Sequence, residues 1–263
     1  MLARARAIFV RDARLAASYR LSFVLQCAGV AAGVVSLWFM AKLVAPSTQF
    51  GPSGTYFAYA VVNIAFLALE SAALSACDKV VRNDQVYGTL ETILATPTSL
   101  AVVAIGSTAW ALVFAFAQVA CYLAFGSLLG LELHRVEPLA LLAFVLLAVG
   151  AIVPLGIVSA ATIMVFKQGA PLEFVFTRLS PILAGVLFPI AVLPGWLQHV
   201  SWFLPMTHVL NGIRGAVNGV AFERLLPDAL WLALAAGLLL PAALLAFRIA
   251  VARAKFDGTL GHY

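Results

Sequence analysis

One acidic residue stands inside a long apolar run of this 263-residue sequence. Glu70 is the only charged residue within residues 56–77. A carboxylate in such surroundings is unfavourable unless a partner compensates its charge, so Glu70 is a candidate functional residue. Three roles are open for it: a structural ion pair with a basic residue such as Arg20 or Lys167, a place in a polar cavity for a substrate, or the proton site of a coupled transporter.

The other residue types that carry catalysis or bind metals are scattered. The histidines and cysteines show no metal-ligand or CxxC spacing; they are His134, His199, His208, His262, Cys27, Cys77 and Cys121. No lysine follows a glycine, so a GxxxxGK[ST] phosphate-binding loop is absent, as are the GxSxG and HExxH motifs. The sequence predicts no catalytic residue, no metal site and no cofactor bound by this chain.

The composition indicates which elements position these residues. Hydrophobic residues make up 63% of the chain and charged residues 10%, and the mean hydropathy is +1.04. Soluble domains carry about 25% charged residues, so the surplus apolar surface must face lipid. Backbone groups in lipid need partners within a helix or a closed barrel, and the apolar runs are too long and continuous for barrel strands. We therefore expect an all-α polytopic membrane protein, with a single transmembrane domain over 1–263.

Six apolar runs are long enough for membrane helices, which need about 20 mostly apolar residues. They are residues 21–44, 56–77, 100–131, 138–166, 174–193 and 229–251. Pro181 and Pro189 break the fifth run, and Pro241 lies inside the sixth. The first run is longer than the apolar core of a signal peptide, so we expect it to be a retained span.

Basic residues at the ends of the runs predict the orientation. With both termini cytoplasmic, twelve of the sixteen Lys and Arg residues fall on the inner side, as the positive-inside rule requires. These are Arg4, Arg6, Arg11, Arg14, Arg20, Lys79, Arg82, Lys167, Arg178, Arg248, Arg253 and Lys255. This bias accounts for the net charge of +5 without a nucleic-acid partner. The charge bias predicts a multi-pass protein of the inner (plasma) membrane. In this orientation Glu70 lies about 12 Å above the cytoplasmic edge, at 1.5 Å per helical residue.

Two cytoplasmic segments have amphipathic character. Residues 1–20 contain five arginines and predict an interfacial helix, the alternative being a basic tail that only sets orientation. In residues 78–99, Asn83 and Asp84 are candidate caps and Pro97 ends the segment. Four apolar residues between them fall on one helical face: Val86, Leu90, Ile93 and Leu94. This helix could pack on the membrane ends of the chain or on a soluble subunit.

Residues 188–220, on the outer side, are apolar and aromatic but contain Pro189, Pro194 and Pro205. Proline prevents one continuous helix here. We expect a pair of short helices that dip into the outer leaflet, because irregular backbone at membrane depth is tolerated where protein covers it.

Residues 85–99 read Gln-Val-Tyr-Gly-Thr-Leu-Glu-Thr-Ile-Leu-Ala-Thr-Pro-Thr-Ser. They resemble the E-x-G-T-L-E-x-L-L-x-x-P signature of type-2 ABC transporter permeases, although Gln85 or Tyr87 replaces the acidic residue before the glycine. The resemblance implies a coupling helix that fits a groove of an ATP-binding subunit. The coupling residues it implies are Gln85, Tyr87, Gly88, Thr89, Leu90, Glu91 and Pro97, together with Arg11 and Arg14.

A second stretch, residues 188–214, is similar to the family pattern F-P-x-x-x-L-P-x-W-L-x…L-P-x-T-x-x-x-x-x-x-R. The matching residues are Pro189, Pro194, Trp196, Pro205, Thr207 and Arg214. This resemblance implies a re-entrant helical hairpin before the last span, acting as an outer gate.

Taken together, the resemblance implies the membrane subunit of an ABC exporter. Two copies would form the pathway, chiefly from spans two and five, and two ATP-binding cassette subunits would bind ATP and Mg. The chain itself would be no enzyme, and it would move a hydrophobic or amphipathic substrate outward (a drug, a lipid or a lipid-linked glycan). Two alternatives stay open: an ion- or proton-coupled secondary transporter using Glu70, and a membrane scaffold without transport activity.

Overall fold

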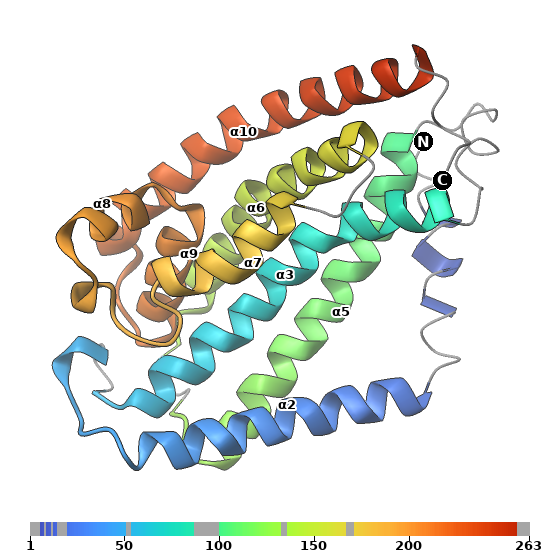
Figure 1. Cartoon of the computed structure of the whole chain (residues 1–263). Helices are drawn as coiled ribbons and strands as arrows, with labels where there is room; N and C mark the ends of the chain where they lie inside the picture. The colour runs from blue at the N-terminus through green and yellow to red at the C-terminus, as the bar shows by residue number, and fades with distance from the viewer. Residues whose placement is uncertain are drawn as a thin grey trace.

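The computed structural model describes residues 6–7, 9–11, 13–14, 20–50, 54–86, 100–132, 136–166 and 171–256 (Figure 1). Within these ranges the regular structure is helical throughout. The α-helices are α2 (Arg20–Ala41), α3 (Tyr56–Val86), α5 (Leu100–Leu128), α6 (Pro138–Phe166), α7 (Pro171–Leu183), α8 (Gly195–Phe203), α9 (Pro205–Val217) and α10 (Phe222–Phe256). Two 3₁₀ turns, η1 (Thr48–Phe50) and η2 (Ile190–Val192), lie in the connections.

Among the described residues, five helices are long and apolar enough to cross a membrane. They are α2, α3, α5, α6 and α10. Large apolar side chains remain on their outer faces; on α10, Leu230, Leu234 and Leu238 are more than 60% exposed. Such a surface is stable in lipid rather than in water, so the predicted helical membrane fold is confirmed for this part of the chain.

The helix α3 lies in the centre of the bundle and packs on α5 and α6, while α10 packs on α6. At the crossing of α3 and α6, a Cβ at Gly156 would lie 2.7 Å from the carbonyl oxygen of Leu74. Only glycine allows this approach, which is typical of helix contacts in membranes. The helix α2 contacts α3 and α5 at the edge of the bundle.

The fifth apolar run differs from the expected single span. The helix α7 has 13 residues and ends at Leu183, so it is about 20 Å long at 1.5 Å per residue. Pro181 lies inside this helix, and the break comes at Gly185, whose φ is +70°. Side chains of α3 satisfy the irregular backbone: Tyr59 Oη donates to the Gly185 carbonyl at 2.5 Å, and Asn63 Nδ2 donates to the Val186 carbonyl at 2.9 Å.

The helix α3 is longer than the second predicted span. It continues to Val86, so Asn83 and Asp84 lie inside it and the prediction that they cap a new helix is wrong. The physical reason is that residues 71–86 contain neither glycine nor proline, so nothing interrupts the helix. Residues 87–99 of the predicted coupling segment lie outside the described residues.

The two ends of the bundle are different. Figure 1 shows α8 and α9 at one end, and the start of α2 and the end of α10 at the other. The described residues among the first 14 are helical, and the ring of Phe9 meets Trp110 of α5 edge-on, with centroids 5.5 Å apart. The N-terminal segment therefore packs on α5.

Candidate functional site

Glu70 is buried near the middle of α3, with 4% of its surface exposed. The hydroxyl of Ser180 on α7 donates a hydrogen bond of 2.8 Å to Glu70 Oε1. The second carboxyl oxygen, Oε2, is buried and has no hydrogen-bond partner. The side chains of Arg20 and Lys167, the predicted ion-pair partners, lie outside the described side chains, so that prediction stays untested.

A cavity of about 240 Å³ lies beside Glu70 between α3, α5 and α7. Ile64, Leu67 and Ala68 form its apolar wall, and the other lining residues are Glu70, Ser71, Tyr122 and Thr177. An acid and an aromatic ring next to an aliphatic wall can recognise a group that is both charged and apolar. The sequence identified Glu70, but Ser180 and Tyr122 carry no signal in an apolar run that would pair them with it.

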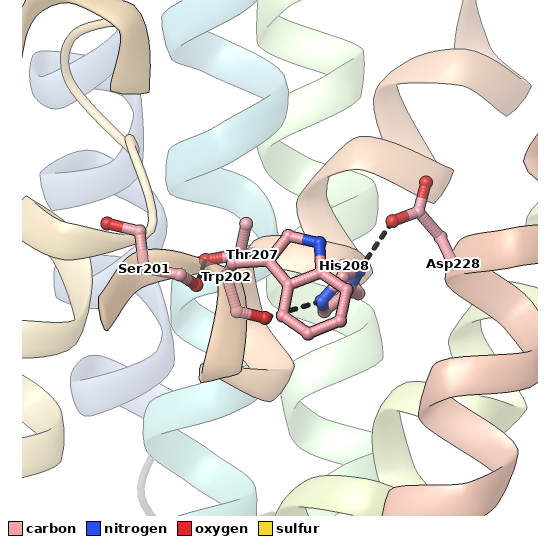
Figure 2. A network of polar contacts seen from close by, with 5 residues as sticks. All are labelled: Ser201, Trp202, Thr207, His208 and Asp228. Atoms are coloured by element: carbon pink, nitrogen blue, oxygen red, sulfur yellow. Dashed lines mark hydrogen bonds and ion pairs between the residues drawn. The ribbon is translucent and has the colours of Figure 1, made fainter. Parts of the chain in front are cut away.

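At the end of the bundle opposite the described N-terminal residues, His208 joins α8, α9 and α10. Figure 2 shows it between Trp202 and Asp228. Its Nδ1 lies 2.5 Å from Asp228 Oδ1, and its Nε2 lies 2.7 Å from the Trp202 carbonyl. The ring also stacks on Trp231, with centroids 4.4 Å apart. Both ring nitrogens thus lie within hydrogen-bond distance of an oxygen atom, so the ring links α9 to α8 and to α10.

The predicted outer residues form the frame of this end. Pro194 precedes α8 and Pro205 begins α9, so the two prolines separate two short helices. Thr207 Oγ1 donates to the Ser201 carbonyl at 2.6 Å and holds the end of α8 on α9. Pro189 precedes η2, while Trp196 is 69% exposed and makes the surface of α8 apolar.

Arg214 lies on the inner face of α9, against α3. Its guanidinium carbon is 4.9 Å from the centre of the Tyr59 ring, and its Nε donates to the Leu210 carbonyl at 3.0 Å. Burial lowers the pKa of Arg214 from its usual value, and the nearby Tyr59 and Asp228 oppose that shift. Arg214 lines a cavity of about 150 Å³ with Tyr59 and Asn218.

The structure does not unite all predicted site residues. Arg11 and Arg14 lie in the helical N-terminal residues with exposed side chains, and Gln85 lies in the last turn of α3. The other coupling residues lie outside the described residues: Tyr87, Gly88, Thr89, Leu90, Glu91 and Pro97. Glu70 and Arg214 line separate cavities. The segment of α7 and the residues after it contacts both: Ser180 bonds Glu70, and Gly185 bonds Tyr59 of the second cavity.

Among the described residues, five long apolar helices packed in one bundle define a polytopic membrane protein. Residues 17–218, more than three-quarters of the chain, match the family described as ABC-2 type transporter. The chain belongs to this family, and the predicted resemblance to type-2 ABC permeases is confirmed.

A curated relative supports the same conclusion over part of the chain. The chain is 28% identical over 129 residues to a protein of Escherichia coli (strain K12) named "Probable multidrug ABC transporter permease YbhR", and equally to that of Escherichia coli O157:H7. The aligned part is 49% of this chain and 35% of each relative. The chain thus spans about a third of the length of these relatives.

Proposed function

We propose that this chain is the permease subunit of an ATP-driven exporter, which moves a hydrophobic or amphipathic substrate outward by alternating access. The observation that carries the proposal is the cavity that Glu70 lines between α3, α5 and α7, in a chain that belongs to the ABC-2 type transporter family. A polar group at this depth is unfavourable unless it serves a pathway or a specific contact. The chain would contribute the pathway and no catalytic residue.

The pathway would have six crossings, of which α7 and the irregular residues 184–186 form the fifth. The hydrogen bonds from Tyr59 and Asn63 support this, because non-helical backbone persists at membrane depth only where protein satisfies it. Six crossings and the distribution of basic residues favour cytoplasmic termini in the inner (plasma) membrane.

The ATP-binding cassette subunits would act on residues 85–97 and on the N-terminal segment with Arg11 and Arg14. Membership of the family implies such partners, and we expect two of them on a homodimer of this chain, with ATP and Mg bound on the partners. The continuous helix α3 would connect the coupling segment to Glu70, since it runs without a break from Gln85 to Tyr56. ATP would then shift the equilibrium between inward and outward states through differential contacts.

The pair α8 and α9 would form the outer re-entrant hairpin and the gate. Its exposed aromatic side chains, Trp196, Trp202 and Phe203, support contact with lipid or with a leaving amphipathic substrate. Thr207 joins α9 to the end of α8, and His208 joins α9 to α10, so the hairpin would move together with the first turns of α10.

A second candidate, a proton- or ion-coupled secondary transporter, is favoured by one observation. Glu70 is a buried carboxyl group with one unpaired oxygen, as a proton-binding residue would be. A single such acid supplies no relay by itself, and the family favours the ATP-driven reading.

Purification of the chain with its native partners distinguishes the ATP-driven exporter from the coupled secondary transporter. We expect an ATP-binding cassette subunit to co-purify, and substrate uptake into inside-out vesicles to require ATP and to persist when an ionophore collapses the pH gradient. Transport that ignores ATP and follows the pH gradient would overturn the proposal in favour of the coupled transporter.

A further inference from the structure

The carboxyl group of Glu70 is incompletely paired in a site built to hold it. Ser180 supplies one O–H to Oε1, whereas Oε2 is buried without a partner. A buried ionised carboxylate normally accepts several hydrogen bonds or meets an opposite charge. Among the described side chains, no positive group meets Oε2.

The helices around the cavity do not provide that positive group among the described side chains. The helix α5 contains no charged residue over Leu100–Leu128, and Arg178 of α7 is exposed. The nearest basic residue of α3, Lys79, is nine positions further along, about 13 Å at 1.5 Å per residue. The described side chains therefore leave this charge to be supplied by a ligand.

The cavity favours a particular kind of cation. Its volume of about 240 Å³ holds a compact organic group, and Ile64, Leu67 and Ala68 offer it aliphatic contact. Tyr122 adds an aromatic ring, and aromatic rings attract ammonium groups through their negative faces. A hydrated metal ion gains nothing from such walls, whereas an alkylated ammonium group gains from each of them.

We propose that Glu70, Tyr122 and the aliphatic wall of this cavity bind the ammonium group of a cationic amphiphile. This inference rests on the proposed export function and gives it a substrate class. It selects cations from among hydrophobic and amphipathic cargo and disfavours lipid-linked glycans and other anionic lipids, because a second negative charge beside Glu70 would be repelled.

The test uses the full chain with its co-purifying partners in micelles of an uncharged maltoside detergent. The probes are radiolabelled decyltrimethylammonium and decyl sulfonate, which share a tail and carry opposite charges. We expect Glu70→Gln, which preserves size and the contact with Ser180, to weaken binding of the cation by about tenfold or more, as loss of a buried charge partner does. Binding of decyl sulfonate should stay as weak as before. Glu223→Gln, the same change at an exposed acid of α10, should leave both unchanged.

A second measurement keeps the wild-type chain and so does not depend on the folding of a variant. Dicyclohexylcarbodiimide modifies carboxyl groups in apolar surroundings, and mass spectrometry locates the product on Glu70. Decyltrimethylammonium should slow this modification and decyl sulfonate should not.

Equal protection by both probes, or unchanged cation binding by Glu70→Gln, would overturn the inference. An ATPase that still co-purifies and couples to transport would then leave the proposed function intact. Failure to find any ATPase, with Glu70-dependent cation binding retained, would instead contradict the proposed function alone.

Discussion

Glu70 and His208 are both buried polar residues of helices, but their hydrogen bonds differ. His208 has an acceptor at each ring nitrogen and an aromatic ring on one face, so nothing in it is left for a ligand. Glu70 has one bonded oxygen and one that is unpaired beside a cavity. At the scale of residues, the first is a structural link and the second is the binding group that we propose.

Removal of the His208 ring should therefore destabilise the protein. His208→Ala leaves Asp228 and the Trp202 carbonyl without their donor and removes the stack on Trp231. We expect a loss of about 1–3 kcal/mol in the free energy of unfolding, the usual penalty for orphaned buried groups. The measurement is the thermal unfolding midpoint of the detergent-purified protein.

His199 provides the matched control, because it is exposed and its ring contacts the Gly195 carbonyl of its own helix. His199→Ala should change the free energy of unfolding by less than about 0.5 kcal/mol. Equal midpoints for the two variants would show that His208 is not the link between α8, α9 and α10.

At the scale of elements, four prolines within the apolar runs do not end their helices. Pro154, Pro181, Pro227 and Pro241 all lie inside helices, because neighbouring helices in a membrane compensate the lost hydrogen bonds. The chain leaves the helical conformation instead at Gly185, whose positive φ and carbonyl contacts with α3 require it. The bounds of α6 could be predicted to the residue from its apolar run, whereas the end of α7 depends on a partner 126 positions away.

The close contact between α3 and α6 at Gly156 predicts that a larger residue there destabilises the protein. In Gly156→Ala the new Cβ would meet the carbonyl oxygens of Leu74 and Ala73 at 2.7 and 2.9 Å, and backbone cannot move aside as a side chain can. We expect about 1–3 kcal/mol of destabilisation from this overpacking. Gel filtration in detergent with thermal melting measures it.

Gly237→Ala on α10 is the control, since nothing lies within 4 Å of a Cβ there. It should be neutral or slightly stabilising, because alanine is the better helix former. If Gly156→Ala leaves the stability unchanged, α3 and α6 are further apart than described.

For the whole molecule, the central helix α3 links the two ends of the bundle. It is about 46 Å long, so it extends beyond a hydrocarbon core of about 30 Å. Gln85 lies in its last turn, Glu70 near its middle, and Tyr59 contacts Gly185 near its first turn. A displacement of the coupling segment would therefore reach both cavities through one rigid element.

Reversal of charge in the coupling segment should uncouple the transporter. Glu91→Arg is expected to reduce ATP-dependent transport about tenfold or more, because it removes a charged contact with the ATP-binding subunit and introduces repulsion. Membrane insertion should stay normal. Transport by vesicles with equal amounts of each protein is the measurement, and unchanged transport would remove residues 85–97 from the coupling role.

The orientation of the chain is also testable. In a variant without native cysteines, Trp196→Cys at the exposed surface of α8 should react with an impermeant maleimide in intact cells. Arg6→Cys, also exposed, should react only after the cells are permeabilised. The reverse pattern would invert the predicted topology.

The sequence by itself determined the class of fold, the position of most helices and the family. These follow from local properties, since a run of apolar residues forms a helix in lipid wherever it lies, and a short motif such as residues 88–97 reads the same in any context. Only the tertiary structure decided that Ser180 and Tyr122 belong with Glu70, that His208 is a link, and that α7 ends at Leu183. The physical reason is that these three features depend on contacts between helices far apart in sequence. Uniformly apolar helices have no sequence pattern that indicates which of their faces meet.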